Sequence, residues 1–139
     1  MRSPWGDLAP AEPGSRESNA WEEIDMSEVR AVAKYIRMSP RKMRLVVDLV
    51  RGRDVTQALD LLQFTPKAAA REVSKVIRSA VANAEENHGL SADELYIAQI
   101  KADEAPTLKR GQAGARGRYK PILKRGSHVT VVLSEKDAA

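Results

Sequence analysis

The apolar positions between Val29 and Gly52 predict a strand followed by a helix. Val29–Met38 carries β-branched and aromatic residues in imperfect alternation and stops before a Ser-Pro pair, which is typical of a strand. Ser39 and Pro40 then supply an N-cap and a first-turn proline. The apolar residues that follow recur at helical spacing up to Gly52, namely Met43, Val46, Val47 and Val50.

Two more helices are predicted by the same spacing. Asp54 is placed to cap a short helix, and Thr65-Pro66 opens a longer one that ends at His88-Gly89. Gly89 suits the left-handed position after a helix, where Leu90 can fold back on the last turn. The buried stripes expected are Val55, Ala58, Leu59 and Leu62 in the first of these helices, and Ala69, Val73, Val76, Ile77, Ala80 and Ala84 in the second.

The last third of the chain predicts two strands joined by a long hairpin at about residues 101–127. The hairpin is expected to turn near Gly114 and to hold Pro106 and Pro121 at similar heights on its two arms. The elements together predict an α+β fold, in which a small three-stranded antiparallel sheet packs against three helices and a long β-hairpin protrudes. The strand residues expected on one face are Tyr96, Ala98, Ile100 and Ala102 before the hairpin, and Val129, Val131 and Leu133 after it.

The length of this hairpin predicts that the body of the protein cannot order it. Arms of about a dozen residues, at about 3.3 Å per residue, carry the tip roughly 40 Å from the body. A lone two-stranded hairpin is only marginally stable in water. We therefore expect an outside partner to order the hairpin; the alternative is a disordered basic loop that binds nothing in particular.

The charge of the hairpin indicates what that partner is. No carboxylate occurs between Leu108 and His128. The arms also hold two glycines, Gly111 and Gly117, which are expected to let them pass close to RNA. Aromatic residues make up only 4% of the chain, which argues against a row of stacking rings and favours folded RNA read by shape and backbone. The cations of this segment are Lys109, Arg110, Arg116, Arg118, Lys120, Lys124 and Arg125.

Two helices add basic groups to this pattern. The first turn of the first helix holds three cations where a helix N-terminus prefers acids, so it suits a bound phosphate; a solvated turn neutralised by Asp48 is the alternative. The third helix carries a basic row that is either a solvated face or a backbone-phosphate contact. These cations are Arg41, Lys42 and Arg44 on the first helix, and Lys67, Arg71, Lys75 and Arg78 on the third.

Residues 1–27 differ from the rest of the chain in composition. They are rich in Pro, Gly and Ser, show no helical or strand period, and hold six acidic residues against two basic ones. We expect a disordered acidic extension over residues 1–27 and one RNA-binding α+β domain over residues 28–139. The latter holds the remaining 21 basic and 13 acidic residues, a balance that favours nucleic acid first and an anionic membrane surface second.

The composition also limits the chemistry that the chain can perform. With no cysteine and two histidines, neither a disulfide nor a metal site is expected, and a reducing cytosol fits best. No phosphate-binding loop or dinucleotide fingerprint occurs, so no cofactor and no enzyme activity are expected. A nuclease that uses His128 as a base beside Glu135 remains a competing interpretation. A free-standing regulator that binds duplex nucleic acid is another.

Six segments of the chain carry a resemblance to a known family: Ala33–Lys42, Leu45–Gly52, Ser79–Glu85, Leu108–Arg110, Ala115–Arg118 and Lys124–Leu133. In this order they resemble the bacterial ribosomal protein L22 family of the large subunit. The resemblance runs from about Val29 to Glu135. One departure lies in the hairpin, where Ala113 and Gly114 stand at the positions of a Pro-Arg pair in the family.

The resemblance implies a structural protein of the cytoplasmic ribosome that binds large-subunit ribosomal RNA early in assembly. It implies neighbouring large-subunit proteins and the nascent polypeptide as further partners, with no membrane partner and no homo-oligomer. The hairpin tip that would help to line the polypeptide exit tunnel is Gln112, Ala113, Gly114 and Ala115. Besides the ten cations of the hairpin and the first helix, the expected RNA-binding residues are Ser39, Ser127 and His128.

Overall fold

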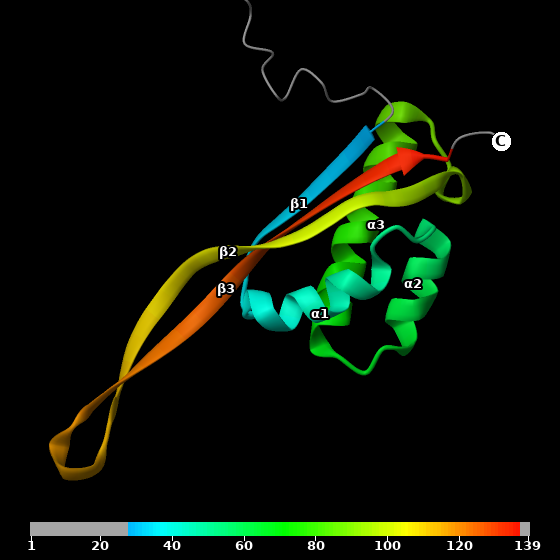
Figure 1. Ribbon diagram of the computed structural model, residues 1–139. Helices are drawn as coiled ribbons and strands as arrows, with labels where there is room; N and C mark the ends of the chain where they lie inside the picture. Colours follow the sequence, from blue (N-terminus) through cyan, green and yellow to red (C-terminus); the bar gives the residue numbers. More distant parts are fainter. Residues whose placement is uncertain (1–27, 137–139) are drawn as a thin grey trace, which may run out of the picture.

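A computed structural model describes residues 28–136, in which three helices and three strands form the predicted α+β fold (Figure 1). The expectation of a disordered extension falls on residues outside this range. None of the helices in the described part of the chain has the length and hydropathy needed to cross a membrane. The elements are β1 (Glu28–Ile36), α1 (Pro40–Val50), α2 (Val55–Phe64), α3 (Ala68–His88), β2 (Leu95–Ala113) and β3 (Tyr119–Glu135).

The sheet is antiparallel with the strand order β1-β3-β2, so β3 lies in the centre. The three helices cover one face of the sheet, and β2 and β3 run on past the body as a twisted ribbon (Figure 1). The last pair between β1 and β3 joins Ile36 to Ser127. Beyond that pair β2 and β3 bond only to each other, which confirms the protruding hairpin.

The core lies between the helices and the covered face of the sheet. It holds the apolar stripes that the helical spacing predicted, except that Leu59 is only partly buried, because a helix on a sheet can bury only one side of its surface. Each strand contributes alternate residues, as period-two geometry requires. The largest fully buried side chains include Met43 and Val47 of α1, Val73 and Ile77 of α3, Ile97 of β2, and Val131 and Leu133 of β3.

The predicted face of β2 is wrong in its first half. Leu95 and Ile97 are buried, whereas Tyr96 and Ala98 are partly exposed. A register shift between Ile97 and Gln99 inserts one extra residue and reverses the alternation. Residues beyond the shift follow the predicted face, so Ile100 and Ala102 are buried together with Ile97.

Several helix ends lie where the sequence placed them: Pro40 opens α1, Asp54 directly precedes α2, and Gly89 directly follows α3. Gly89 has a φ of 65°, and the Leu90 N–H donates to the Ala84 carbonyl, so α3 ends as predicted. Its first residue, however, is Ala68 rather than Pro66. Asp54 precedes α2 but makes no side-chain cap bond, because its carboxylate pairs with Lys136 at 3.2 Å instead.

Candidate nucleic-acid interface

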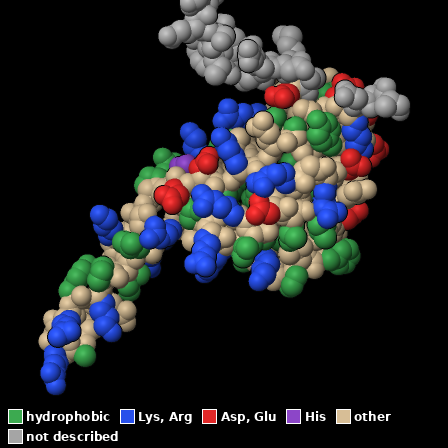
Figure 2. Space-filling model, viewed as in Figure 1, with side chains coloured by type: hydrophobic (Ala, Val, Ile, Leu, Met, Phe, Trp, Pro, Cys, Tyr) green, Lys and Arg blue, Asp and Glu red, His purple; other side chains and the backbone are tan. Residues whose placement is uncertain are grey.

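The hairpin beyond the sheet is the most exposed part of the described chain. It runs from Ser127 to an apex at Arg116, a span of about 35 Å at about 3.3 Å per residue. Even its large apolar side chains stand in solvent, since Tyr119 is 71% and Leu123 is 47% exposed. Figure 2 shows Lys and Arg side chains along this ribbon and over the adjoining face of the body.

The apex of the hairpin lies two to three residues beyond the predicted turn at Gly114. Arg116 and Gly117 have φ values of 57° and 73°, and the Arg118 N–H donates to the Ala115 carbonyl at 3.3 Å. Positive φ at both central residues is the geometry of a type I′ turn, which glycine favours. Gly117 is therefore the turn glycine, while Gly114 has ordinary extended backbone.

One other expectation about the arms is wrong, namely that Pro106 and Pro121 stand at similar heights. Pro121 pairs with Gly111 near the apex, whereas Pro106 lies at the root, in a register shift between Ala105 and Leu108. The two prolines therefore stand at different heights. A side chain at Gly111 would clash with the ring of Tyr119, so this glycine provides a close approach within the protein itself.

The seven hairpin cations are all exposed, and within residues 28–136 no carboxylate lies at ion-pair distance from any of them. The ribbon thus presents unneutralised charge over its whole length. Of the tip predicted to face the tunnel, Gln112 and Ala113 end the β2 arm, and Gly114 and Ala115 lead into the apex. Arg116 is the outermost turn residue, which the sequence did not assign to the tip.

The cations at the start of α1 do not behave alike. Arg41 and Lys42 are exposed, but Arg44 donates from Nε to the Ala102 carbonyl at 3.2 Å and so ties α1 to β2. Asp48, the predicted alternative partner of this turn, pairs with Arg51 at 2.8 Å. Ser39 precedes α1 without a side-chain cap bond.

The basic row of α3 is exposed and borders a hollow of about 310 Å³. Lys75 pairs with Glu72 at 3.4 Å, an exposed contact of little energetic weight. Lys67, Arg71 and Arg78 have no carboxylate at ion-pair distance among the described residues. The row therefore extends the basic surface of the hairpin and α1 onto a third element.

Two residues at the hairpin root, Ser127 and His128, are engaged with β1. Ser127 is fully buried, and its hydroxyl donates to the carbonyl of Met38, so we leave it out of the exposed interface. Nδ1 of His128 accepts the backbone N–H of Tyr35 at 3.0 Å, and the two rings meet edge to face. Both residues fasten the hairpin root to the end of β1.

We expect Ser127→Ala to lower the free energy of unfolding by about 1–3 kcal/mol, because it leaves the Met38 carbonyl without its buried donor. Urea denaturation followed by circular dichroism measures this. Ser79→Ala, at an exposed site on α3, is the matched control and should change stability by less than about 0.5 kcal/mol. Equal stability of the two variants would contradict the assigned role of Ser127.

The pair that a nuclease would need does not form. His128 pairs with Asp103 and Glu135 with Leu95, so the two side chains lie about 23 Å apart along β3 at about 3.3 Å per residue. Across the described part of the chain, no group of three acidic or histidine side chains could hold a metal ion. The competing interpretation of His128 as a base with Glu135 is wrong.

Sequence reasoning missed the end of β1, where Tyr35 and Arg37 are exposed beside the hairpin root. Tyr35 has a φ of 60°, and the pairing with β3 shifts between Ala33 and Ile36. The imperfect alternation of this strand was the available signal. It marked an irregularity without indicating which side chain the irregularity exposes.

Fold and surface together define a class, that of a small basic α+β protein with a long hairpin that holds no carboxylate between Leu108 and His128. Residues 31–134 match the family described as Ribosomal protein L22p/L17e. The chain belongs to this family, which is one of ribosomal proteins and not of enzymes.

Two relatives illustrate the similarity, and both are named large ribosomal subunit protein uL22. The protein of Thermoanaerobacter sp. (strain X514) is 54% identical over 110 residues, which cover 79% of this chain and 99% of that protein. The protein of Clostridium novyi (strain NT) is 56% identical over 109 residues, which cover 78% and 98%. Membership therefore rests on nearly the whole length of these relatives.

Proposed function

We propose that this protein is a structural component of the large ribosomal subunit and binds large-subunit ribosomal RNA. The observation that carries the proposal is the exposed hairpin, whose seven cations have no carboxylate partner among the described residues. Family membership supplies the setting, since the relatives are named as large-subunit proteins of the ribosome. The protein acts in the cytoplasmic ribosome and performs no catalytic step.

The hairpin enters RNA as the two-stranded ladder that the structure describes, whereas the sequence predicted that an outside partner orders it. Its arms already bond to each other from Leu108–Lys124 to Ala113–Tyr119, so binding has to fix fewer backbone torsions than in a disordered loop. Phosphates on both sides of the thin ribbon meet Lys and Arg and release their condensed counterions. Arg41 and Lys42 extend this contact to the start of α1.

The apex of the hairpin faces the polypeptide exit tunnel in this proposal. Its span of about 35 Å, at about 3.3 Å per residue, supports a position far inside the RNA while the helices stay at the surface. Gln112 to Ala115 and the outermost Arg116 then border the nascent chain. Neighbouring ribosomal proteins contact the body, and binding early in assembly joins RNA segments around the ribbon.

The test measures binding of the full chain to large-subunit ribosomal RNA extracted from ribosomes of Clostridium acetobutylicum. The large ribosomal subunit protein uL22 of this organism is 51% identical to the chain. We expect saturation at one protein per RNA and an affinity that falls steeply with salt, because each neutralised phosphate contributes about 0.7–0.9 to the log–log slope. Duplex RNA of random sequence is the competitor. Equal affinity for the competitor would favour a free-standing duplex binder. An affinity that does not change with salt would exclude both the ribosomal function and the duplex binder.

A further inference from the structure

Tyr35 is held outside the protein by a backbone conformation that non-glycine residues rarely adopt. Its φ is 60°, and its N–H donates to Nδ1 of His128 at 3.0 Å. Tyr35 is nevertheless 67% exposed, and within residues 28–136 its ring meets the His128 ring, at 5.0 Å and nearly perpendicular. Such conformations persist where the surrounding structure enforces them, and they concentrate at binding sites.

The side of Tyr35 toward the hairpin borders a slot of about 270 Å³. Apolar groups of Ile36, Pro106 and Leu108 line it. This volume is below the roughly 300–1,000 Å³ of pockets for drug-sized ligands, so the slot suits a single planar ring system. The cations around it are Arg37, Lys124 and Arg125.

The slot depends on a close approach of strands at the hairpin root. A Cβ at Gly126 would stand 3.2 Å from both the Ala105 Cβ and the Ile36 carbonyl oxygen. Glycine therefore lets β1, β2 and β3 converge at the root. The slot lies at the point where the pairing of β1 ends and the ribbon begins.

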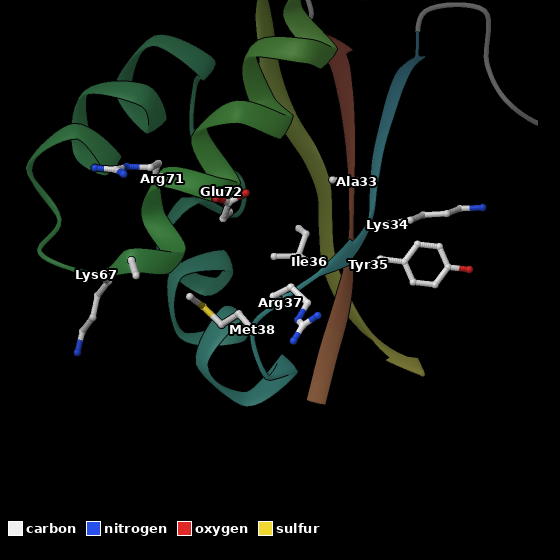
Figure 3. A pocket seen from close by; sticks show the side chains of 10 residues that line it. Ala33, Lys34, Tyr35, Ile36, Arg37, Met38, Lys67, Arg71 and Glu72 are labelled. Atoms are coloured by element: carbon white, nitrogen blue, oxygen red, sulfur yellow. The ribbon is translucent and has the colours of Figure 1, made fainter. Parts of the chain in front are cut away.

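A second hollow, of about 720 Å³, borders Tyr35 on the side of the helices. In Figure 3, Tyr35 and Lys34 project from one side of β1, whereas Ile36 and Met38 turn toward the helices. Lys67, which directly precedes α3, and Arg71 of α3 lie across this hollow. The Tyr35 ring itself projects away from this hollow and from the helices (Figure 3).

We propose that Tyr35 is a stacking platform for one unpaired base of RNA, which enters the slot at the hairpin root. The base rests on the exposed ring and on apolar groups, and its flanking phosphates meet Arg37, Lys124 and Arg125. Unstacked bases in folded RNA bind aromatic side chains in this way, because every base offers a π-face. The inference rests on the proposed RNA-binding function and adds a contact with a base to contacts with the backbone.

Tyr35→Ala tests the proposal in the full chain with the ribosomal RNA of Clostridium acetobutylicum described above. We expect affinity to fall about 5- to 100-fold, which is typical for loss of one stacked base. The slope of affinity against salt should stay unchanged, because no phosphate contact is removed. Tyr35→Phe keeps the ring and should bind as the wild type does. Phe64→Ala is the matched control, since it removes an 81% exposed ring at the end of α2.

A second variant guards against misfolding. Tyr35→Asn also removes the ring, and asparagine tolerates positive φ better than alanine, so it should fold and show the same loss. Wild-type affinity in both ring-free variants would overturn the stacking proposal and leave the proposed function intact. A reduced salt slope in the ring-free variants would also overturn it, because the loss would then be one of phosphate contacts. If the wild-type protein itself did not bind this RNA, both the stacking proposal and the proposed function would be overturned.

Discussion

We expect replacement of Arg116, Arg118 and Lys120 by glutamine to weaken binding to large-subunit ribosomal RNA on the order of 100-fold at 0.1 M salt. The three side chains surround the apex, are exposed and have no carboxylate at ion-pair distance within residues 28–136. Loss of three phosphate contacts should lower the slope of log affinity against log salt by about 2–3, at about 0.7–0.9 per contact. Filter binding over a salt series measures both quantities.

The matched control retains the charge of the apex. Arg116→Lys combined with Arg118→Lys preserves the cations but removes the planar guanidinium groups. If the apex mainly neutralises phosphates, this double variant keeps the wild-type slope and loses little affinity. A glutamine variant with unchanged slope and affinity would show that the apex is not inside RNA. A lysine variant as weak as the glutamine variant would instead indicate bidentate recognition by arginine.

Ile77→Ala should lower the free energy of unfolding by about 2–5 kcal/mol. Ile77 is fully buried on α3 among residues of the helices and the sheet, and truncation removes apolar contacts and leaves a cavity. This is a large fraction of the about 5–15 kcal/mol that stabilises a typical domain. Urea denaturation followed by circular dichroism measures the change. Under conditions in which the variant is fully folded, its affinity for RNA should equal that of the wild type.

Leu45→Ala is the control for this prediction. Leu45 also lies on a helix but is 62% exposed, so its truncation should cost less than about 0.5 kcal/mol. Similar losses for the two variants would mean that the packing between α3 and the sheet does not dominate stability. The variant with glutamine at Arg116, Arg118 and Lys120 should have the same free energy of unfolding as the wild type, because these three side chains are exposed.

The helices could be predicted because their local patterns and their packing agree. Met43, Val46, Val47 and Val50 occur at helical spacing, and all four are buried. The face of β2 could not be predicted in full, since the extra residue near Ala98 carries no glycine or proline to mark it. Its position depends on pairing with β3, which local sequence does not specify.

Charge in the candidate site was easier to predict than the partner of each charge. The absence of acids between Leu108 and His128 identified the hairpin as a basic surface from the sequence alone. Arg44 has the same charge as Arg41 but donates to a carbonyl of β2, a contact between segments far apart in sequence. Tyr35 was missed for the same reason, because its exposure follows from a strand irregularity beside β3.

The regular ladder between β2 and β3, from Leu108–Lys124 to Ala113–Tyr119, also limits how this hairpin can change in evolution. Side chains alternate between the two faces of the ribbon, so one residue inserted into one arm would exchange the faces of all residues between it and the apex. That exchange is avoided when residues are added or removed as cross-strand pairs, with one residue from each arm. Two such pairs have to change together. Hairpins of different length among relatives should therefore differ in steps of this kind, and the reach of the apex should change in increments of about 6–7 Å.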